Sequence, residues 1–193
     1  AAAEWMAEHG SLAGLTLRAL AAAAGVSHNA IYRHYGSVED MSMDLAADFV
    51  QQLRQGLADA RATLKPGEAP TRAVVGWLFD FALQHPAHFK AAQMTRQGPP
   101  GAARDLLESH LDEVRRDMQT QLMQKGMLPS LSAADLETAL AIIIEHTFTL
   151  CIRCIEAPLQ REALLVRAEQ GFTWVLSGAA LTAATGNLPK PGP

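Results

Sequence analysis

Apolar residues recur every three or four positions along most of this 193-residue chain, which is the spacing of amphipathic α-helices. A stripe made of Leu45, Phe49, Leu53 and Leu57 predicts one long helix over residues 39–64. No stretch alternates β-branched and polar residues with a period of two, so strands are not expected. The pattern therefore predicts an all-α protein.

Proline and glycine mark the breaks between the later helices. The sequence KPGEAP (65–70) predicts a loop, and GPPG (98–101) is the sharpest break in the chain. Pro86 is expected in the first turn of a helix, because proline loses no helical hydrogen bond there. The other apolar stripes predict helices over residues 71–84, 102–125, 133–156 and 160–181.

Near the N-terminus, residues 16–40 carry the signals of two short helices joined by a tight turn. Thr16 and Ser27 are expected as N-caps, since a hydroxyl can accept from the free amides of a first turn. Gly25 stands where the first of these helices must end with positive φ, and Gly36 is expected to end the second. A helix-turn-helix of this kind places its second helix in the major groove of DNA.

The string T-L-R-x-L-A-x-x-A-G-V-S, followed at once by x-x-x-I-Y-x-H-Y-x-S-x-E-D, resembles the N-terminal domain of the TetR family of bacterial transcription regulators. The resemblance covers about the first quarter of the chain. It implies a three-helix helix-turn-helix DNA-binding domain, followed by a helical ligand-binding and dimerisation domain. We place these domains at residues 1–45 and 46–184, and we expect a flexible tail over residues 185–193.

The resemblance also implies which residues contact DNA. Asparagine at the start of the reading helix can pair with adenine, and histidine can donate to guanine. Tyr32 and His34 match the family's aromatic and histidine positions, although the first would also suit packing and the second a helix-end cation. The candidate DNA-binding residues are Thr16, Arg18, Ser27, His28, Asn29, Ala30, Tyr32, Arg33 and His34.

This segment departs from the family pattern in two positions and in its charge. Ala30 stands where the family often has a small hydroxyl residue, and Val38 stands where it usually has a lysine. Residues 1–45 hold two arginines against five acidic residues, a net charge of −3, which is poor for phosphate contacts. We expect further residues upstream of Ala1 that strengthen DNA binding.

The last two predicted helices are the most apolar part of the chain. One is apolar almost all round, and the other mixes large apolar residues with small ones. A helix buried on several faces needs a further layer or a second subunit against it. We therefore expect a homodimer through residues 133–157 and 160–181, which would read two half-sites of a near-palindromic double-stranded DNA operator.

In the TetR family the second domain holds an effector pocket among its central helices. Aromatic and methionine side chains suit an apolar, adaptable pocket, although each would equally suit ordinary core. Few charges interrupt these helices, so a small hydrophobic or amphipathic effector is expected. The candidate lining residues are Trp77, Phe81, Phe89, Met94, Met118, Leu122, His146 and Phe148.

A second, shorter resemblance concerns residues 78–90, with the sequence L-F-D-F-A-L-Q-H-P-A-H-F-K. This segment looks like that of TetR-type repressors of unsaturated fatty-acid synthesis, and Val38 in place of lysine is also reminiscent of them. Those repressors sense acyl-CoA. The resemblance therefore implies an acyl-type effector.

Composition argues against several other classes of protein, including nucleic-acid coats, disulfide-rich secreted proteins and membrane proteins. The net charge of −4 argues against indiscriminate coating of nucleic acid. Two cysteines give no disulfide framework and fit a reducing compartment. No signal-peptide pattern is visible, and the most apolar run, residues 139–144, is too short to span a bilayer. We expect a cytoplasmic protein without membrane association.

Cys151 and Cys154, with His146 nearby, have the residue types of a nucleophile, a redox pair or a metal site. They lie inside an apolar run, where cysteine usually behaves as a small hydrophobe. The sequence shows no catalytic triad, phosphate-binding glycine loop or zinc-finger spacing, so we expect no enzyme, metal or cofactor. The prediction is a ligand-responsive regulator; the alternatives are a cysteine-based redox or metal-responsive regulator, and a helical adaptor or enzyme without specific DNA binding.

Overall fold

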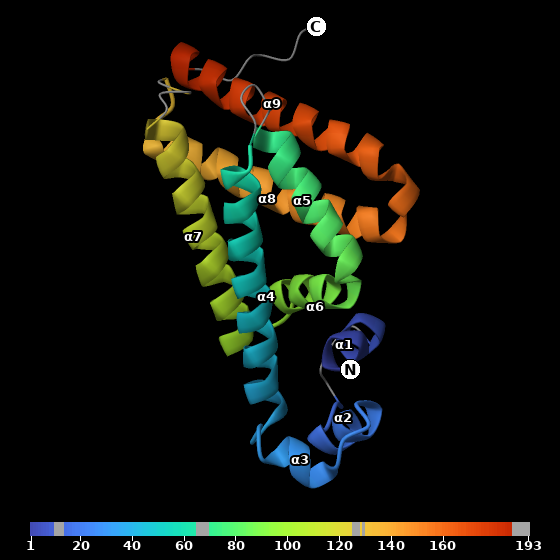
Figure 1. Cartoon of the computed structure of the whole chain (residues 1–193). Helices are drawn as coiled ribbons and strands as arrows, with labels where there is room; N and C mark the ends of the chain where they lie inside the picture. Colours follow the sequence, from blue (N-terminus) through green and yellow to red (C-terminus); the bar gives the residue numbers. More distant parts are fainter. Residues whose placement is uncertain (10–13, 65–69, 125–127, 129, 187–193) are drawn as a thin grey trace, which may run out of the picture.

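The structure is a computed structural model of the chain, and it describes residues 1–9, 14–64, 70–124, 128 and 130–186. Every regular element in these residues is helical, which confirms the predicted all-α class. Figure 1 shows short helices at one end of the molecule and a bundle of longer helices at the other.

The short helices are α1 (Ala2–His9), α2 (Leu17–Ala23) and α3 (His28–Tyr32). α2 and α3 pack against each other across a turn, and Trp5 from α1 packs against the core that they share. The buried apolar residues of this core are Leu15, Leu17, Leu20, Ala21, Ile31 and Met41. The segment is therefore a helix-turn-helix with a small core of its own.

Both predicted N-caps of the helix-turn-helix are formed. Thr16 Oγ1 accepts from the backbone amide of Ala19 at 3.1 Å, and Ser27 Oγ accepts from that of Ala30 at 3.2 Å. Gly25 turns the chain between α2 and α3 with a φ of 68°, a conformation that costs glycine least. Local hydrogen bonding therefore fixes where these two helices begin.

The predicted end of α3 was wrong. The helix ends at Tyr32, and the following residues form a turn, whereas the sequence pattern extended the helix to Gly36. The amide of Gly36 donates instead to Asp40 Oδ2 at 3.2 Å. This hydrogen bond ties the turn to the start of the next helix. A glycine suits the position, because a Cβ would lie only 3.1 Å from that carboxylate oxygen.

α4 (Val38–Ala62) connects the short helices to the bundle as one helix of 25 residues. Phe49, Leu53 and Leu57 of the predicted stripe are buried along one side of it. Leu45 packs instead in a separate small cluster with α1 and α6. The helix therefore has apolar contacts with both ends of the molecule (Figure 1).

The bundle is completed by helices that follow the predicted boundaries closely. Pro86 occupies the first turn of its helix, as predicted. The elements are α5 (Pro70–Gln84), α6 (Pro86–Gln97), α7 (Ala102–Gln124), α8 (Ala133–Glu156), a 3₁₀ turn (Pro158–Gln160) and α9 (Arg161–Thr185).

α9 is longer than its apolar pattern predicted. It continues past Leu181 to Thr185 and ends at Gly186, which has a φ of 66°. Thr185, the first residue of the predicted tail, therefore belongs to α9, and residues 187–193 lie outside the described residues. Residues 65–69 of the predicted KPGEAP loop also lie outside them.

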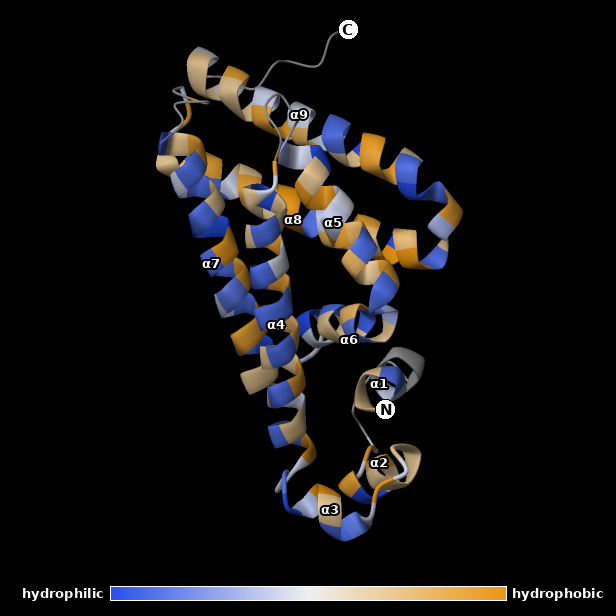
Figure 2. Cartoon of the chain, viewed as in Figure 1, coloured by the Kyte–Doolittle hydropathy of each residue, from blue (hydrophilic) through white to orange (hydrophobic). Residues whose placement is uncertain are grey.

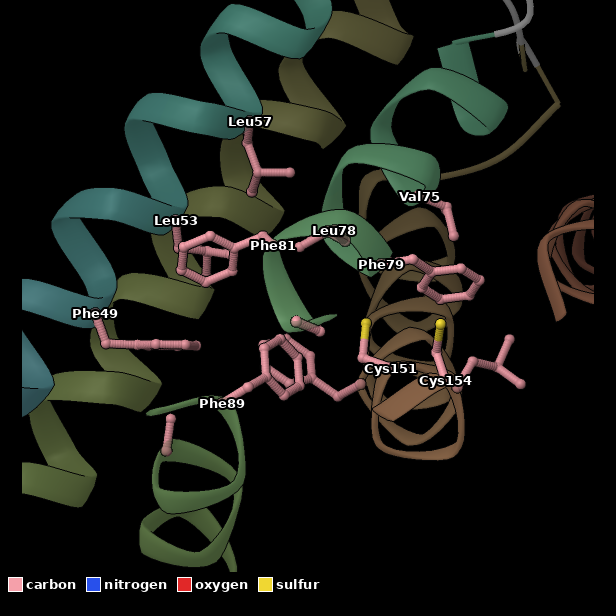
Figure 3. Close-up of a cluster of buried hydrophobic side chains, with 14 of the residues drawn as sticks. Phe49, Leu53, Leu57, Val75, Leu78, Phe79, Phe81, Phe89, Cys151 and Cys154 are labelled. Carbon is pink, nitrogen blue, oxygen red and sulfur yellow. The ribbon is translucent and has the colours of Figure 1, made fainter. Parts of the chain in front are cut away.

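The main core combines buried residues from α4, α5, α6, α7, α8 and α9, and it is built around phenylalanines (Figure 3). The Phe49 ring lies 5.8 Å from both Phe81 and Phe89, measured between centroids. Phe89 stacks on Phe148 at 5.2 Å, with 30° between the ring planes. Offset and edge-on contacts of this kind add to the gain from burial alone.

α8 has the length and composition of a membrane-spanning helix, with a mean hydropathy of 1.6 over its most apolar 18 residues. This stretch is longer than the apolar run of residues 139–144 from which no membrane span was predicted. Half of the window is buried inside the bundle, where α8 packs against α5, α7 and α9. Its apolar character therefore matches the central helix of a packed domain.

Replacing Gly56 with alanine tests the packing of α4 against α5. A Cβ at Gly56 would overlap the indole of Trp77, which stacks on Phe81 with 5.2 Å between centroids. We expect Gly56→Ala to lower the free energy of unfolding by about 1–3 kcal/mol, as overpacking does, although alanine favours helix. Urea unfolding followed by circular dichroism measures this change.

The matched control is the same substitution in a Trp77→Leu background. Without the indole, Gly56→Ala should be neutral or should stabilise the protein by up to about 1 kcal/mol through helix propensity. An equal loss of stability in both backgrounds would contradict the proposed overlap, because the coupling between the two positions would then be absent.

Candidate nucleic-acid interface and effector cavity

α3 lies at the tip of the molecule, at the far end from α9 (Figure 1). Eight of the nine candidate DNA-binding residues are exposed, and only Ala30 is half-buried. The buried side of α3 is provided by Ile31, which packs in the small core. The helix therefore presents its polar side to solvent, as a reading helix must.

Tyr32 is 48 % exposed, and its ring lies 4.4 Å from the ring of His28, measured between centroids. The contact links the first and last turns of α3 on its outer side. Tyr35, in contrast, packs against the small core, and burial raises the pKa of its phenol, with a smaller contribution from Asp44. Of the two tyrosines, Tyr32 is therefore the one available to DNA.

A second contact joins the helix-turn-helix to the bundle. Ala3 of α1 and Ala91 of α6 are both buried where these helices pack together. Met94, a candidate pocket residue, packs in this contact. Small side chains let α1 and α6 approach closely, so α6 touches the DNA-binding end directly.

An apolar cavity of about 50 Å³ lies inside the bundle, between α4, α5, α7, α8 and α9. Met118 and Phe148 are the two candidate pocket residues in its wall. The lining residues are Leu53, Leu57, Arg61, Val74, Val75, Leu78, Leu111, Val114, Met118, Ile143, Ile144, Thr147, Phe148 and Phe172.

The other candidate pocket residues lie elsewhere. Phe81 and Phe89 are buried in the main core (Figure 3). Trp77 stacks on Phe81. Leu122 packs with a cluster of α8 and α9 residues. His146 lies against Gly171 of α9, where a Cβ would stand 3.4 Å from the imidazole. None of these residues borders this cavity, and their effector role stays a prediction.

Two further spaces adjoin the cavity along α4. A crevice of about 10 Å³ shares Leu53, Leu111, Val114 and Phe148 with the cavity wall. The crevice in turn shares wall residues with an open groove of about 520 Å³ along α4. The residues common to crevice and groove are Val50, Arg54 and His110. The three spaces therefore follow α4 from the surface to the interior.

Sequence reasoning missed most of the cavity wall, because it favoured aromatic and methionine residues over aliphatic ones. One usable signal was present in α4. Leu53, Leu57 and Arg61 follow one another at four-residue spacing, so a charged residue continues the buried apolar stripe.

Cys151 and Cys154 are completely buried in the main core, beside Phe79 (Figure 3). Burial raises the pKa of both thiols, and the neighbouring Cys154 adds to the effect at Cys151. Within the described residues, no group of three or more His, Cys, Asp and Glu side chains is placed to hold a metal ion. The cysteines thus pack as core residues.

The fold and the exposed helix-turn-helix define a helical DNA-binding regulator. Residues 1–42 match the family model described as bacterial regulatory proteins, tetR family. The chain's N-terminal domain therefore belongs to the TetR family of transcriptional regulators.

Two solved structures are similar to nearly the whole chain. The fatty acid degradation regulator FadR from Bacillus halodurans has a TM-score of 0.72 and 16 % identity, covering 92 % of this chain and 91 % of its own. The ketosteroid transcriptional regulator KstR2 of Mycobacterium tuberculosis has a TM-score of 0.62 and 22 % identity, covering 92 % and 90 %. At these low sequence identities, the similarity shows a common fold only.

The buried thiols lead to a direct test. In the native protein, both cysteines should react with Ellman's reagent about a thousandfold more slowly than in denaturant, since reaction requires the core to open. Absorbance at neutral pH follows the reaction, with the protein in denaturant as the control. Rapid reaction of either thiol in the native state would revive the redox-responsive alternative.

Proposed function

We propose that this protein is a transcriptional repressor that binds a near-palindromic operator as a homodimer and leaves it when a small hydrophobic or acyl-type effector binds. One observation carries the proposal: α4 is a single helix that starts beside the exposed α3 and lines the apolar cavity near its other end. We take residues 1–45 as the DNA-binding domain and residues 46–184 as the effector-binding and dimerisation domain, with α4 crossing the boundary.

The size of the cavity supports a coupling between the two ends. The cavity volume of about 50 Å³ is the space open to the centre of a water-sized sphere. It has room for only a few water molecules, because about 10–15 Å³ of such space admits one. An effector must therefore separate α4 from the helices packed against it. Closely packed interiors do not deform continuously, so this separation would move α4 to a second position. A shift of this kind favours release only if the effector binds the second position more tightly.

The effector class is supported by the walls of the cavity. They are apolar except at Arg61 and Thr147, which suits a hydrocarbon body. The two structural relatives are named as regulators of fatty acid degradation and as a ketosteroid regulator, both concerned with apolar compounds. The resemblance of residues 78–90 to repressors of unsaturated fatty-acid synthesis favours an acyl chain.

The proposal of a homodimer is supported by exposed apolar side chains on α8 and α9. Val166, Trp174 and Leu181 fall on one face of α9, spaced eight and seven residues apart, and Trp174 is 71 % exposed. Ile142 of α8 is also more than half exposed. Apolar side chains grouped on a surface mark an interaction site, and tryptophan is enriched in such sites. Figure 2 shows apolar residues along α9 at the outside of the bundle.

Specific DNA binding is the first test. Asn29→Ala and Tyr32→Ala should each weaken binding to the DNA flanking the protein's own gene by about 5- to 150-fold, the effect of losing about 1–3 kcal/mol of base contact. Both side chains are exposed, so folding should be unchanged. Fluorescence anisotropy at fixed salt concentration measures the affinity.

Arg116→Ala is the control, because Arg116 is exposed on α7, a helix of the bundle that is not part of the helix-turn-helix. It should bind the same DNA as tightly as the unchanged protein. If neither α3 variant loses affinity, the assignment of α3 as the reading helix is wrong.

The dimer surface is tested by Trp174→Ala. Truncation of a central interface tryptophan typically costs 2 kcal/mol or more, so the dimer should dissociate at about 30-fold higher concentration. Met123→Ala is the control, since Met123 is a 55 % exposed apolar residue on α7. Sedimentation over a concentration series measures the dimer dissociation constant of each variant and of the unchanged protein. Equal dissociation constants for Trp174→Ala and the unchanged protein would show that the assignment of α9 to the dimer interface is wrong.

A further inference from the structure

The wall of the cavity contains a single charged group in the part of the chain that the structure describes. This group is the guanidinium of Arg61, in the last turn of α4. The only other polar side chain in the wall is Thr147, whose hydroxyl donates to the backbone oxygen of Ile143 at 2.7 Å. The cavity is thus an apolar space with one cation in its wall.

Arg61 differs from the basic side chains along the neighbouring crevice, which all lie near a carboxylate. Arg54 pairs with Glu113 at 2.6 Å, and His110 approaches the same carboxylate at 3.3 Å. Arg96 pairs with Glu108 at 2.9 Å and also with Glu145. Among the described residues, no carboxylate lies within 4.0 Å of the Arg61 guanidinium.

The surroundings of Arg61 do not replace the missing partner. Burial lowers the pKa of its guanidinium, and the exposed Asp117 of α7 offsets this only in part, at a distance. A charge drawn partly out of water is costly unless a partner of opposite sign approaches it. An anion placed in the cavity would supply that partner.

We propose that Arg61 binds the carboxylate of an effector whose apolar body fills the cavity, so that the effector is an amphipathic acid such as a fatty acid. This inference rests on the proposed function and narrows its effector class. The planar guanidinium can donate two parallel hydrogen bonds to a carboxylate. The aliphatic and aromatic walls formed by Leu57, Val114 and Phe148 surround the hydrocarbon.

The position of Arg61 also gives the acid a means of acting on DNA binding. Arg61 belongs to the same face of α4 as Leu53 and Leu57, which hold this helix in the bundle. A carboxylate bound there attaches α4 to the effector, while the hydrocarbon separates α4 from α7 and α8. The acid therefore acts on the helix that leads to α3.

The test compares two probes of equal chain length, dodecanoate and methyl dodecanoate, by isothermal titration calorimetry below their aggregation concentrations. The ester keeps the hydrocarbon but carries no charge. The unchanged protein should bind dodecanoate about tenfold or more tightly, as expected for a charge-assisted hydrogen bond. Arg61→Gln should bind both probes equally, and Arg61→Lys should keep part of the preference for the acid.

Arg54→Gln is the matched control, because Arg54 lies on the same helix and is already paired with Glu113. It should keep the full preference for dodecanoate. Equal binding of both probes by the unchanged protein, or a preserved preference in Arg61→Gln, overturns the carboxylate site and leaves the apolar effector of the proposed function in place. Binding of neither probe overturns both. A melting curve of Arg61→Gln at or above that of the unchanged protein shows that loss of preference is not loss of fold.

Discussion

Burial of one side of α4 is the interaction on which both ends of the molecule depend. Phe49, Leu53 and Leu57 anchor the helix in the bundle, while Met41, near its start, is buried in the core of the helix-turn-helix. One helix therefore contributes to two cores. Because neither core can lose α4 without exposing apolar surface, the two ends are connected mechanically as well as by sequence.

Arg96 provides a second connection, built from charge instead of apolar contact. It is 8 % exposed, pairs with Glu108 of α7 and Glu145 of α8, and lies 4.8 Å from the centre of the Phe148 ring. Phe148 lines the cavity, and α6, which carries Arg96, packs against α1. A buried arginine with these partners holds α6, α7 and α8 in one arrangement, since separating them would leave its charge unpaired.

The fold could be predicted from sequence wherever short-range chemistry decides it. The hydroxyls of Thr16 and Ser27 and the glycine at position 25 act on residues close by, so the helix-turn-helix was readable. The end of α3 could not be predicted in this way, because Gly36 makes its hydrogen bond to the following helix. The class of regulator was recognisable from the first 40 residues, whereas the contribution of each candidate residue to DNA binding stays a prediction.

The proposed effector cavity was the least predictable part, since five helices far apart in sequence form its wall. Aromatic residues such as Phe81 and Phe89 have the same chemistry whether they fill a core or border a space, and only packing distinguishes these cases. Arg61 is the exception, because a cation on a buried stripe is unusual in any context.

Because α4 is long, a small tilt at its cavity end produces a large displacement at its start. The 20 residues between Leu57 and Ser37 span about 30 Å, so a tilt of about 5° at the cavity would displace the start of the helix by about 2.6 Å. In a two-fold dimer the displacement occurs once in each subunit, and the two reading helices would shift in opposite directions. Half-sites one helical turn apart on DNA fix a spacing of about 34–36 Å, which does not stretch with the protein. In the proposed dimer, the rigidity of α4 would convert a tilt too small to alter either domain internally into a mismatch of register on DNA.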